Sequence, residues 1–579
     1  LLKAKRADVH ERVGRWTDAA AMDVIGEHEA AIAYHYEQAH DFLRELGTLD
    51  DQGRALGRRS AELLTVAAAR ALEREDLAAA AGLAGRAVAL AGPDKTVAVP
   101  ALLIACESLL ASGEARRATP LVEDLTDMAL GDARLGAWAD CFTAQVIALT
   151  DPDRLAEAEA LTTSASLVLH DLDDLAGAAK AHLVRASVMA RLGRVGECEA
   201  ELDAALAAAR AVDDHRRVTA VLGAAPTAAL WGPSPLARAG GRCLDVVRLL
   251  RITGASPSVE ASSMRSQAVL EALRGRFDAA RAMIERSRAA LEELGLHSGL
   301  LEADLFAGII ELTADDAVAA EPPLRAAYQG LGSLGVGADA GLAAALLSGA
   351  LLTQGRVDEA EELAAASEAM AGQNLKTAIA WRAARARIAS ARGDHTGAVA
   401  NAEDAVHIAA PTDLLLDHAD ACVALASVRA AAGDTLGAEQ AARDAAALYE
   451  QKGAATLAHR LAAPSTAAEP ARSAAAPNTT PADTTPGPDN LATRQIRDGC
   501  RAITDGDEDA FAAHSMDEFV AVDYRPGMTN RVEGAAENLE HLRVFHEVLH
   551  GATYDVVEVV AQRGDLLTLV RNLVYGAFE

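Results

Sequence analysis

The stretch QGRVDEAEELAAASEA, residues 354 to 369, places a glycine between two segments of helical character. Gly355 follows one apolar pattern, and the acidic residues Asp358, Glu359 and Glu361 open the next. Glycine readily adopts the left-handed backbone conformation that ends many helices, and negative charge is favourable in the first turn of a helix. The stretch therefore predicts one helix that ends, a tight turn and a second helix.

The same pattern returns along most of the chain at a steady interval, which indicates an internal repeat. Ten anchor positions, one in each predicted turn, lie 38 to 43 residues apart: Glu75, Gly113, Asp151, Gly193, Gly232, Gly275, Asp315, Gly355, Gly393 and Gly433. The residue five positions after each anchor is small: Ala80, Ala118, Ala156, Cys198, Ala237, Ala280, Ala320, Ala360, Ala398 and Ala438. The residue seven positions before each anchor is also small: Ala68, Cys106, Ala144, Ala186, Ala225, Ala268, Gly308, Ser348, Ala386 and Ala426.

These two columns of small residues predict how each pair of helices packs. Small side chains that face each other across a helix pair allow the two backbones to approach closely. The composition agrees, because 51% of residues are hydrophobic but only 3% are aromatic. A core of alanine and leucine favours packed helices over sandwiches or barrels, which draw on β-branched and aromatic residues. We therefore expect a mostly α protein with about ten helix-turn-helix units.

The small, glycine and small positions resemble the tetratricopeptide repeat over residues 61–462. These units are near 40 residues long instead of the family's 34, and they lack its usual proline at the end of the second helix. Elongated units of this kind are similar to the sensor region of MalT-type signal-transduction ATPases. The resemblance implies an α-solenoid whose concave face binds a protein segment or a small ligand. We expect specificity to come from residues that vary between units and from the domain beyond residue 490.

Residues 1–60 have a different character and resemble the helical junction that follows an ATPase module of the AAA or STAND type. Parents of this sort often carry an adenylate or guanylate cyclase domain, or a LuxR-type DNA-binding domain. No G-x-x-x-x-G-K-[ST] loop occurs in the chain, so ATP and magnesium would belong to a domain upstream of Leu1. Because the chain also lacks an initial methionine, we expect a fragment of a multidomain regulator. His35, between Tyr34 and Tyr36, is interpreted as a packed residue at this junction and not as a catalytic one.

Charge and cysteine content argue against several classes of partner and site. The net charge of −30 and the isoelectric point near 4.9 repel a nucleic acid backbone. The six cysteines include no C-x-x-C pair, which argues against zinc and a disulfide framework. No apolar run is long enough to span a bilayer. We expect a cytoplasmic protein with no cofactor or metal in this chain.

Beyond the repeats, residues 463–489 are rich in proline, alanine and threonine and predict an extended linker. Residues 490–579 then read as helices followed by strands, with a β-hairpin joined at the RGD sequence near residue 564. The segments GDEDAFAAH, FVAVDYRP and VEGAAEN resemble the SnoaL-like family of small α+β cones. The resemblance implies an internal pocket, in a domain that we expect to be incomplete at its C-terminus.

Members of that fold use the pocket for acid/base chemistry or for binding alone. Asp523 is the candidate general base, with His514, Tyr524 and Arg525 as its possible neighbours. An alternative interpretation is that Asp523 and Arg525 form a surface ion pair, and fold alone does not establish catalysis.

His541, His546 and His550 lie along a predicted helix, but no third carboxylate ligand accompanies them, so a helix face is favoured over a metal site. Two hypotheses follow for the chain as a whole. Either it is a non-catalytic sensor and scaffold of a signalling ATPase, or the C-terminal domain is an enzyme or binding pocket that the repeats position.

Overall fold

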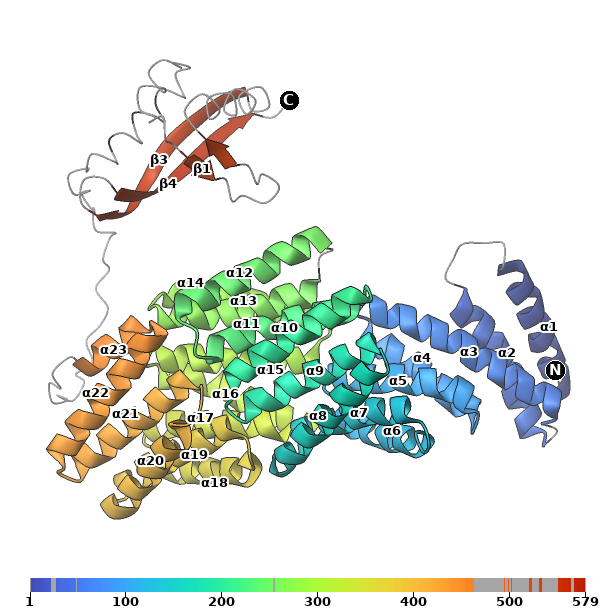
Figure 1. The fold of residues 1–579 in the computed structure, drawn as a ribbon, viewed down its shortest axis with the longest axis horizontal. Coiled ribbons are helices and arrows are strands. Elements are labelled where there is room, and N and C mark those ends of the chain that lie inside the picture. Colours follow the sequence, from blue (N-terminus) through green and yellow to red (C-terminus); the bar gives the residue numbers. More distant parts are fainter. Residues whose placement is uncertain are drawn as a thin grey trace. The chain divides into compact units, whose positions relative to one another are not determined.

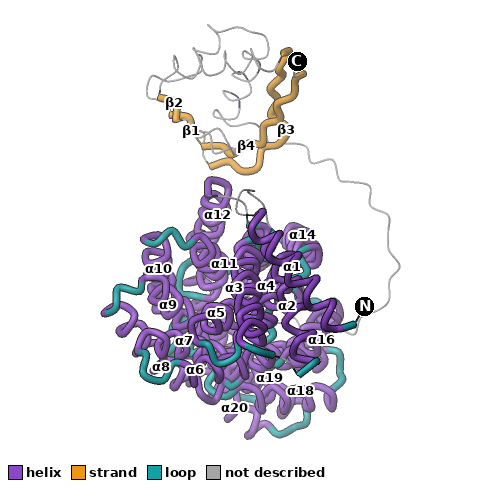
Figure 2. Tube along the Cα trace, turned by 90° about the vertical axis from the view of Figure 1, so that its right-hand side faces the viewer, coloured by secondary structure: helices purple, strands orange, loops and turns teal. Residues whose placement is uncertain are grey.

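The computed structural model describes residues 2–21, 28–47, 49–253 and 256–462, together with residues 494, 498, 501, 520–522, 531–533, 550–563 and 567–577. The chain divides into two compact units, Leu1–Thr466 and Ala467–Glu579. In the described parts, the helices with defined bounds belong to the first unit and the four strands belong to the second (Figure 1, Figure 2).

The first unit is a solenoid of antiparallel helix pairs, and this confirms the predicted fold. Consecutive helices lie side by side from α1 to α23 (Figure 1). The ten predicted repeats are α3 (Asp51–Glu73) with α4 (Leu77–Ala91), α5 (Lys95–Ala111) with α6 (Ala115–Met128), α7 (Ala133–Thr150) with α8 (Leu155–Asp171), α9 (Leu175–Arg191) with α10 (Val195–Ala211), α11 (His215–Trp231) with α12 (Leu236–Thr253), α13 (Pro257–Leu273) with α14 (Phe277–Glu293), α15 (His297–Thr313) with α16 (Ala317–Leu334), α17 (Gly337–Thr353) with α18 (Val357–Ala371), α19 (Leu375–Ala391) with α20 (His395–Ala409), and α21 (Leu415–Ala431) with α22 (Thr435–Lys452).

The repeats are flanked by further helices within the first unit. α1 (Lys3–Ala21) and α2 (Glu29–Glu45) precede them, and α23 (Ala455–Ala462) follows. α3 runs without a break across residue 60, so a single helix joins the predicted junction to the first repeat.

Each anchor residue lies in the turn within a helix pair. Eight of the ten have a positive φ, for example Gly355 at 80° and Asp315 at 66°. At Gly355 the backbone N–H donates to the Leu352 carbonyl at 2.9 Å, and the N–H of Arg356 donates to Leu351 at 3.0 Å. These bonds close the last turn of α17, because the left-handed residue points the following amides back at the free carbonyls.

The expected left-handed turn is wrong at Asp151 and Gly232. Their φ values are −136° and −73°. Both residues precede a proline, Pro152 or Pro233, and proline forces the residue before it into the extended region. The next helix therefore begins four residues after the anchor instead of two, as α8 does at Leu155.

This longer turn also displaces the small residue that packs in the pair. Ala156 and Ala237, five positions after these two anchors, are exposed, so their predicted packing role is wrong. Ala158 and Ala239, two residues further on, are fully buried in their place. At the eight other anchors, the residue five positions later is buried: Ala80, Ala118, Cys198, Ala280, Ala320, Ala360, Ala398 and Ala438.

The two columns of small residues meet inside a helix pair. The Ser348 hydroxyl on α17 donates to the Ala360 carbonyl on α18 at 2.6 Å, and both residues are fully buried. At Gly308, an added Cβ would lie 2.3 Å from Cγ of Leu324 on the partner helix. Close backbone approach therefore explains why these positions are small.

The solenoid also winds back onto itself along a line of contacts that we call the seam. On its earlier side lie the turns that contain Pro152, Gly193 and Gly232, and on its later side lie Gln373, Asp413 and Lys452. The side-chain bonds across it join residues 217 to 223 positions apart in the chain. Successive superhelical turns are therefore in direct contact.

Two of the contacts across the seam have the same geometry. The Gln373 backbone N–H donates to the Pro152 carbonyl at 2.9 Å, and its side-chain oxygen accepts from the Ala156 N–H at 2.8 Å. The Asp413 N–H donates to Gly193 at 2.9 Å, and its carboxylate accepts from the N–H of Gly196 at 2.9 Å. α8 and α10 have no side-chain cap from their own preceding residue. The later turn supplies that cap instead.

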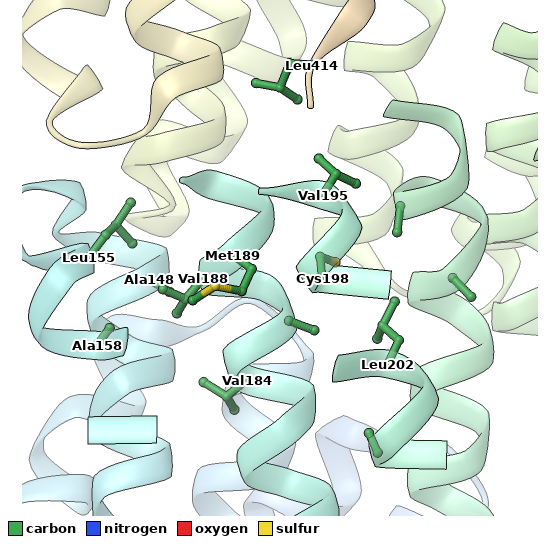
Figure 3. Packing of buried hydrophobic residues seen from close by; sticks show 14 of the residues in the cluster. Ala148, Leu155, Ala158, Val184, Val188, Met189, Val195, Cys198, Leu202 and Leu414 are labelled. Carbon is green, nitrogen blue, oxygen red and sulfur yellow. The ribbon is translucent and has the colours of Figure 1, made fainter. Parts of the chain in front are cut away.

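The third contact across the seam is made by the Lys452 side chain, which is fully buried. Its Nζ donates to the carbonyls of Gly232 at 2.6 Å and Ser234 at 2.8 Å. The hydrophobic core follows the same path, since Val195 and Cys198 of α10 share one cluster with Leu414 from the turn before α21 (Figure 3). This cluster thus joins buried residues of successive superhelical turns.

In the second unit, the described residues form two antiparallel strand pairs. β1 (Val520–Val522) pairs with β2 (Arg531–Glu533), and β3 (His550–Arg563) pairs with β4 (Leu567–Ala577). The last pair lies where the hairpin was predicted. Residues 494, 498 and 501 are helical. The rest of the predicted helical segments of this domain up to residue 549, and the linker over 463–489, lie outside the described residues, so the SnoaL-like resemblance stays a prediction.

Candidate ligand-binding cavity

A cavity of about 680 Å³ lies inside the solenoid of the first unit. Its walls come mainly from the first helix of successive pairs, from α5 to α19. The volume falls within the range of small-molecule sites, which are usually lined by apolar groups and a few placed polar ones. Here the apolar part includes Val184, Trp231 and Phe306.

The charged side chains of the cavity wall come from different repeats. Lys180 on α9 and Arg216 on α11 both contact the carboxylate of Glu107 on α5, with N–O distances of 3.3 and 2.7 Å. Lys180 also donates to the side-chain oxygen of Gln145 at 2.5 Å and lies 4.5 Å from the ring centre of Phe142. The Glu107 carboxylate is therefore shared by two basic side chains, Lys180 and Arg216.

Burial and charge oppose each other at Glu107. Burial alone would raise the pKa of this carboxyl, but the neighbouring Lys180 and Arg216 hold it below its ordinary value. Burial lowers the pKa of Lys180, while the charge of Glu107 acts in the opposite direction. We conclude that Glu107 is ionised at neutral pH and balances only part of the positive charge beside it.

The other cations of the wall have carboxylate partners of their own. Arg191 makes two bonds to Asp339, at 3.1 and 3.2 Å, across 148 residues of sequence. Arg265 pairs with Glu302 at 2.6 Å. Lys376 pairs with Asp417 at 2.7 Å and lies 3.7 Å from the ring centre of Trp231.

Many residues of the cavity wall occupy the same position within their repeats. The residues thirteen positions before five successive anchors all line the cavity: Lys180, Thr219, Ser262, Glu302 and Leu342. They differ in charge, polarity and size, unlike the small-residue columns. None of these five residues was predicted from the sequence, although a column that varies within a regular repeat is the signal that marks them.

The sequence-predicted residues fall elsewhere. The structure places Gly113, Gly193, Gly275, Gly355, Gly393 and Gly433 at left-handed turn positions, Gly232 at an extended one, and Ala118, Ala280, Ala360, Ala398 and Ala438 in buried helix contacts. Of these, Gly113 also borders the cavity.

The catalytic candidates cannot be placed in this way. Asp523, His514, Tyr524 and Arg525 lie outside the described residues, as do His541 and His546. His550 is the first residue of β3, so its predicted place on a helix face with His546 is wrong.

His35 on α2 has a partner that sequence analysis missed. Its Nδ1 lies 3.0 Å from Nδ1 of His10 on α1. The neighbouring Tyr36 is buried, and its hydroxyl donates to Asp18 at 3.1 Å. These contacts hold α1 against α2, which agrees with a packing role for the stretch Tyr34, His35 and Tyr36.

Chemically reactive groups are scarce in the described part of the chain. The thiols of Cys106, Cys141, Cys198, Cys243 and Cys422 are buried and unpaired. Burial raises the pKa of Cys106 to about 12, which keeps it protonated and a poor nucleophile. Across the described residues, no group of three or more His, Cys, Asp or Glu side chains is arranged to hold a metal ion. The helices with described bounds include none with the length and apolar character needed to cross a bilayer.

Comparisons with known proteins give likenesses of fold alone. No family model matches the chain, and no curated protein matches it. A Rap protein solved in complex with competence and sporulation factor has a TM-score of 0.45 and 13% identity, over 63% of this chain and 98% of that one.

Two further solved structures are similar over more of this chain. Yeast Tom70 has a TM-score of 0.32 and 11% identity, over 79% and 96% of the two chains. The Cut9 and Hcn1 assembly of the APC/C has a TM-score of 0.30 and 14% identity, over 75% and 95%. At this level of identity, the chain is similar to these proteins as an array of helical repeats.

Proposed function

We propose that the first unit is a non-catalytic binding scaffold that takes a protein segment or a small ligand inside its solenoid. The observation that carries this proposal is the cavity of about 680 Å³, whose wall combines apolar side chains with charged ones from several repeats. The charges are held by partners on other helices, as Arg191 is by Asp339, so the wall is organised before any ligand arrives. A preformed site of this kind loses less entropy when it binds.

Filling the cavity tests this proposal. Gly223 lies on α11 in the cavity wall, and an added Cβ there would meet only Val259, at 3.6 Å. Gly223→Trp therefore places an indole in the cavity with little disturbance of the helix. Gly82→Trp is the matched control, because Gly82 is an exposed helical glycine with nothing within 4 Å of an added Cβ.

The measurement is a thermal-shift screen of a defined set of short peptides and metabolites against the whole chain. Compounds that raise the Tm of the wild type should also raise that of Gly82→Trp and leave Gly223→Trp unchanged. Binders that shift all three proteins equally would contradict the proposal, because they would bind outside the cavity.

We further propose that this scaffold is the sensor of a multidomain signalling ATPase or cyclase regulator. The support is the resemblance of residues 1–60 and 61–462 to the corresponding parts of such proteins. Sequencing the gene upstream of the codon for Leu1 tests it. A phosphate-binding loop in the same reading frame would support the proposal, and an upstream region without one would contradict it.

A further inference from the structure

Positive charge is in excess at one place in the cavity wall. Glu107 is shared by Lys180 and Arg216, whereas Arg191, Arg265 and Lys376 each have a carboxylate of their own. With Lys180 and Arg216 both protonated, these three side chains carry one net positive charge. The acidic wall residue outside these ion pairs is Glu75, whose carboxylate accepts from the Ser256 hydroxyl at 2.7 Å.

Arg216 is the member of this group that a ligand can reach. Its side chain is 27% exposed, whereas that of Lys180 is 2% exposed. Arg216 lines the cavity and donates through Nη1 to Glu107, and its guanidinium has further N–H donors. Guanidinium groups bind carboxylates and phosphates through paired hydrogen bonds.

The cavity face of α11 beyond Arg216 carries small side chains. Ala220, Gly223 and Ala224 lie on it, together with the hydroxyl-bearing Thr219 and Thr227, and Trp231 ends the helix. Fifteen residues of α-helix separate Arg216 from Trp231, which corresponds to about 22 Å. At the far end, the ring of Trp231 meets that of Phe306 edge to face, with 5.8 Å between centroids.

We propose that the cavity binds an elongated amphipathic organic anion, with its carboxylate or phosphate group at Arg216 and its apolar body along α11 toward Trp231. This inference rests on the proposed binding function and specifies the ligand. The cationic end supplies charge complementarity for an anion in a chain whose net charge is −30. The small residues of α11 leave room for a chain, and the aromatic pair closes the far end. Lys376 and Arg265 lie over these two rings, and their charges are paired with Asp417 and Glu302.

A fluorescent fatty acid and its neutral ester test the inference. cis-Parinaric acid and its methyl ester share a hydrocarbon chain and differ in charge. We expect the wild type to bind the acid at least about tenfold more tightly than the ester. Arg216→Gln should remove this preference, and Arg216→Lys, which keeps the charge, should retain most of it. Arg443→Gln, at a 62% exposed arginine on α22, should behave as the wild type.

Competition identifies the headgroup. Dodecanoate or dodecyl phosphate should displace the bound cis-parinaric acid. The compound that does so at the lower concentration carries the headgroup that the cavity prefers. Dodecanol should displace it far less well. Equal displacement by dodecanol would overturn the inference, as would equal affinity for acid and ester, or a preference that Arg216→Gln and Arg216→Lys both keep.

Failure of this inference can be told apart from failure of the proposed function. If acid and ester bind equally and Gly223→Trp excludes both, the cavity is a binding site and only its charge preference is wrong. If neither probe binds the wild type, the amphipathic anion is wrong, and the peptide and metabolite screen judges the scaffold separately.

Discussion

The interior of the helix pairs and the wall of the cavity are built by opposite rules. Inside the pairs, the same small residue recurs from unit to unit, as at Ala320, Ala360 and Ala398, because each pair must close to the same distance. Along the cavity wall, the residue changes from unit to unit, from Lys180 to Glu302. Recurrence thus specifies packing, and variation specifies what the solenoid can bind.

The largest effect is expected from the cavity wall. Glu107→Gln removes the carboxylate that Lys180 and Arg216 share and leaves the buried lysine without an anion. We expect a loss of about 3 kcal/mol in the free energy of unfolding, measured by urea denaturation followed by circular dichroism. Glu403→Gln is the control, because Glu403 is 52% exposed beside Arg429, and its loss should cost less than about 1 kcal/mol. Similar losses in both variants would mean that the wall charges do not act as a buried network.

The next effect tests the pair interior. Ala360→Leu places a large side chain where Ser348 contacts the backbone, and we expect it to cost about 1 to 3 kcal/mol in the same assay. Ala237→Leu occupies the equivalent column but is exposed, since Pro233 lengthens its turn, and it should change stability by less than about 0.5 kcal/mol. Equal costs would contradict the displaced packing at the two proline turns.

A smaller effect on stability is expected at the seam, which follows neither the recurrence seen inside the helix pairs nor the variation seen along the cavity wall. Gln373→Ala removes the side-chain oxygen that accepts from the Ala156 N–H at the start of α8. Loss of a helix cap costs about 1 kcal/mol. The matched control is Gln440→Ala, whose amide bonds only to Asp444 and Arg443 on its own helix and should have little effect. The amides in the first turn of α8 should therefore exchange faster in Gln373→Ala than in the control, and equal or slower exchange would contradict the proposed cap.

The smallest effect is a pH dependence at Lys452. Burial lowers the pKa of this lysine from 10.5 to about 8 in the folded chain. At pH values between about 8 and 10.5, the unfolded chain binds more protons than the folded one, so the free energy of unfolding rises with pH. The contribution of Lys452 to stability is therefore lost as the pH drops from 10.5 to about 8. From pH 8 to 9, wild type should gain up to about 1 kcal/mol relative to Lys452→Met, measured by urea denaturation at each pH. An unchanged difference would mean that Lys452 keeps its ordinary pKa.

The sequence was sufficient for the repeated fold because the fold depends on local spacing. Gly355 and Ala360 are read from one unit, and their roles follow from a single turn and a single helix contact. Ala156 and Ala237 depart from the predicted packing for an equally local reason, because Pro152 and Pro233 directly follow the anchor residues in the sequence.

The cavity could not be predicted in the same way. The contact of Arg191 with Asp339, and the sharing of Glu107 by Lys180 and Arg216, depend on the pitch of the superhelix. Pitch accumulates from small rotations between units, and no single unit encodes it. The seam has the same origin, since Gln373 caps α8 only if more than five units stack with the observed rotation.

The seam also limits how this chain can change its length. In an open solenoid each unit touches only its neighbours, so whole units can be gained or lost without disturbing distant ones. Here, deleting one unit between Ser234 and Gln373 would move each later turn out of register with its partner, and Lys452 would lose the carbonyls of Gly232 and Ser234. The contacts across the seam also give the protein many long-range contacts, which slow folding because distant units must form before the superhelical turns can close on each other.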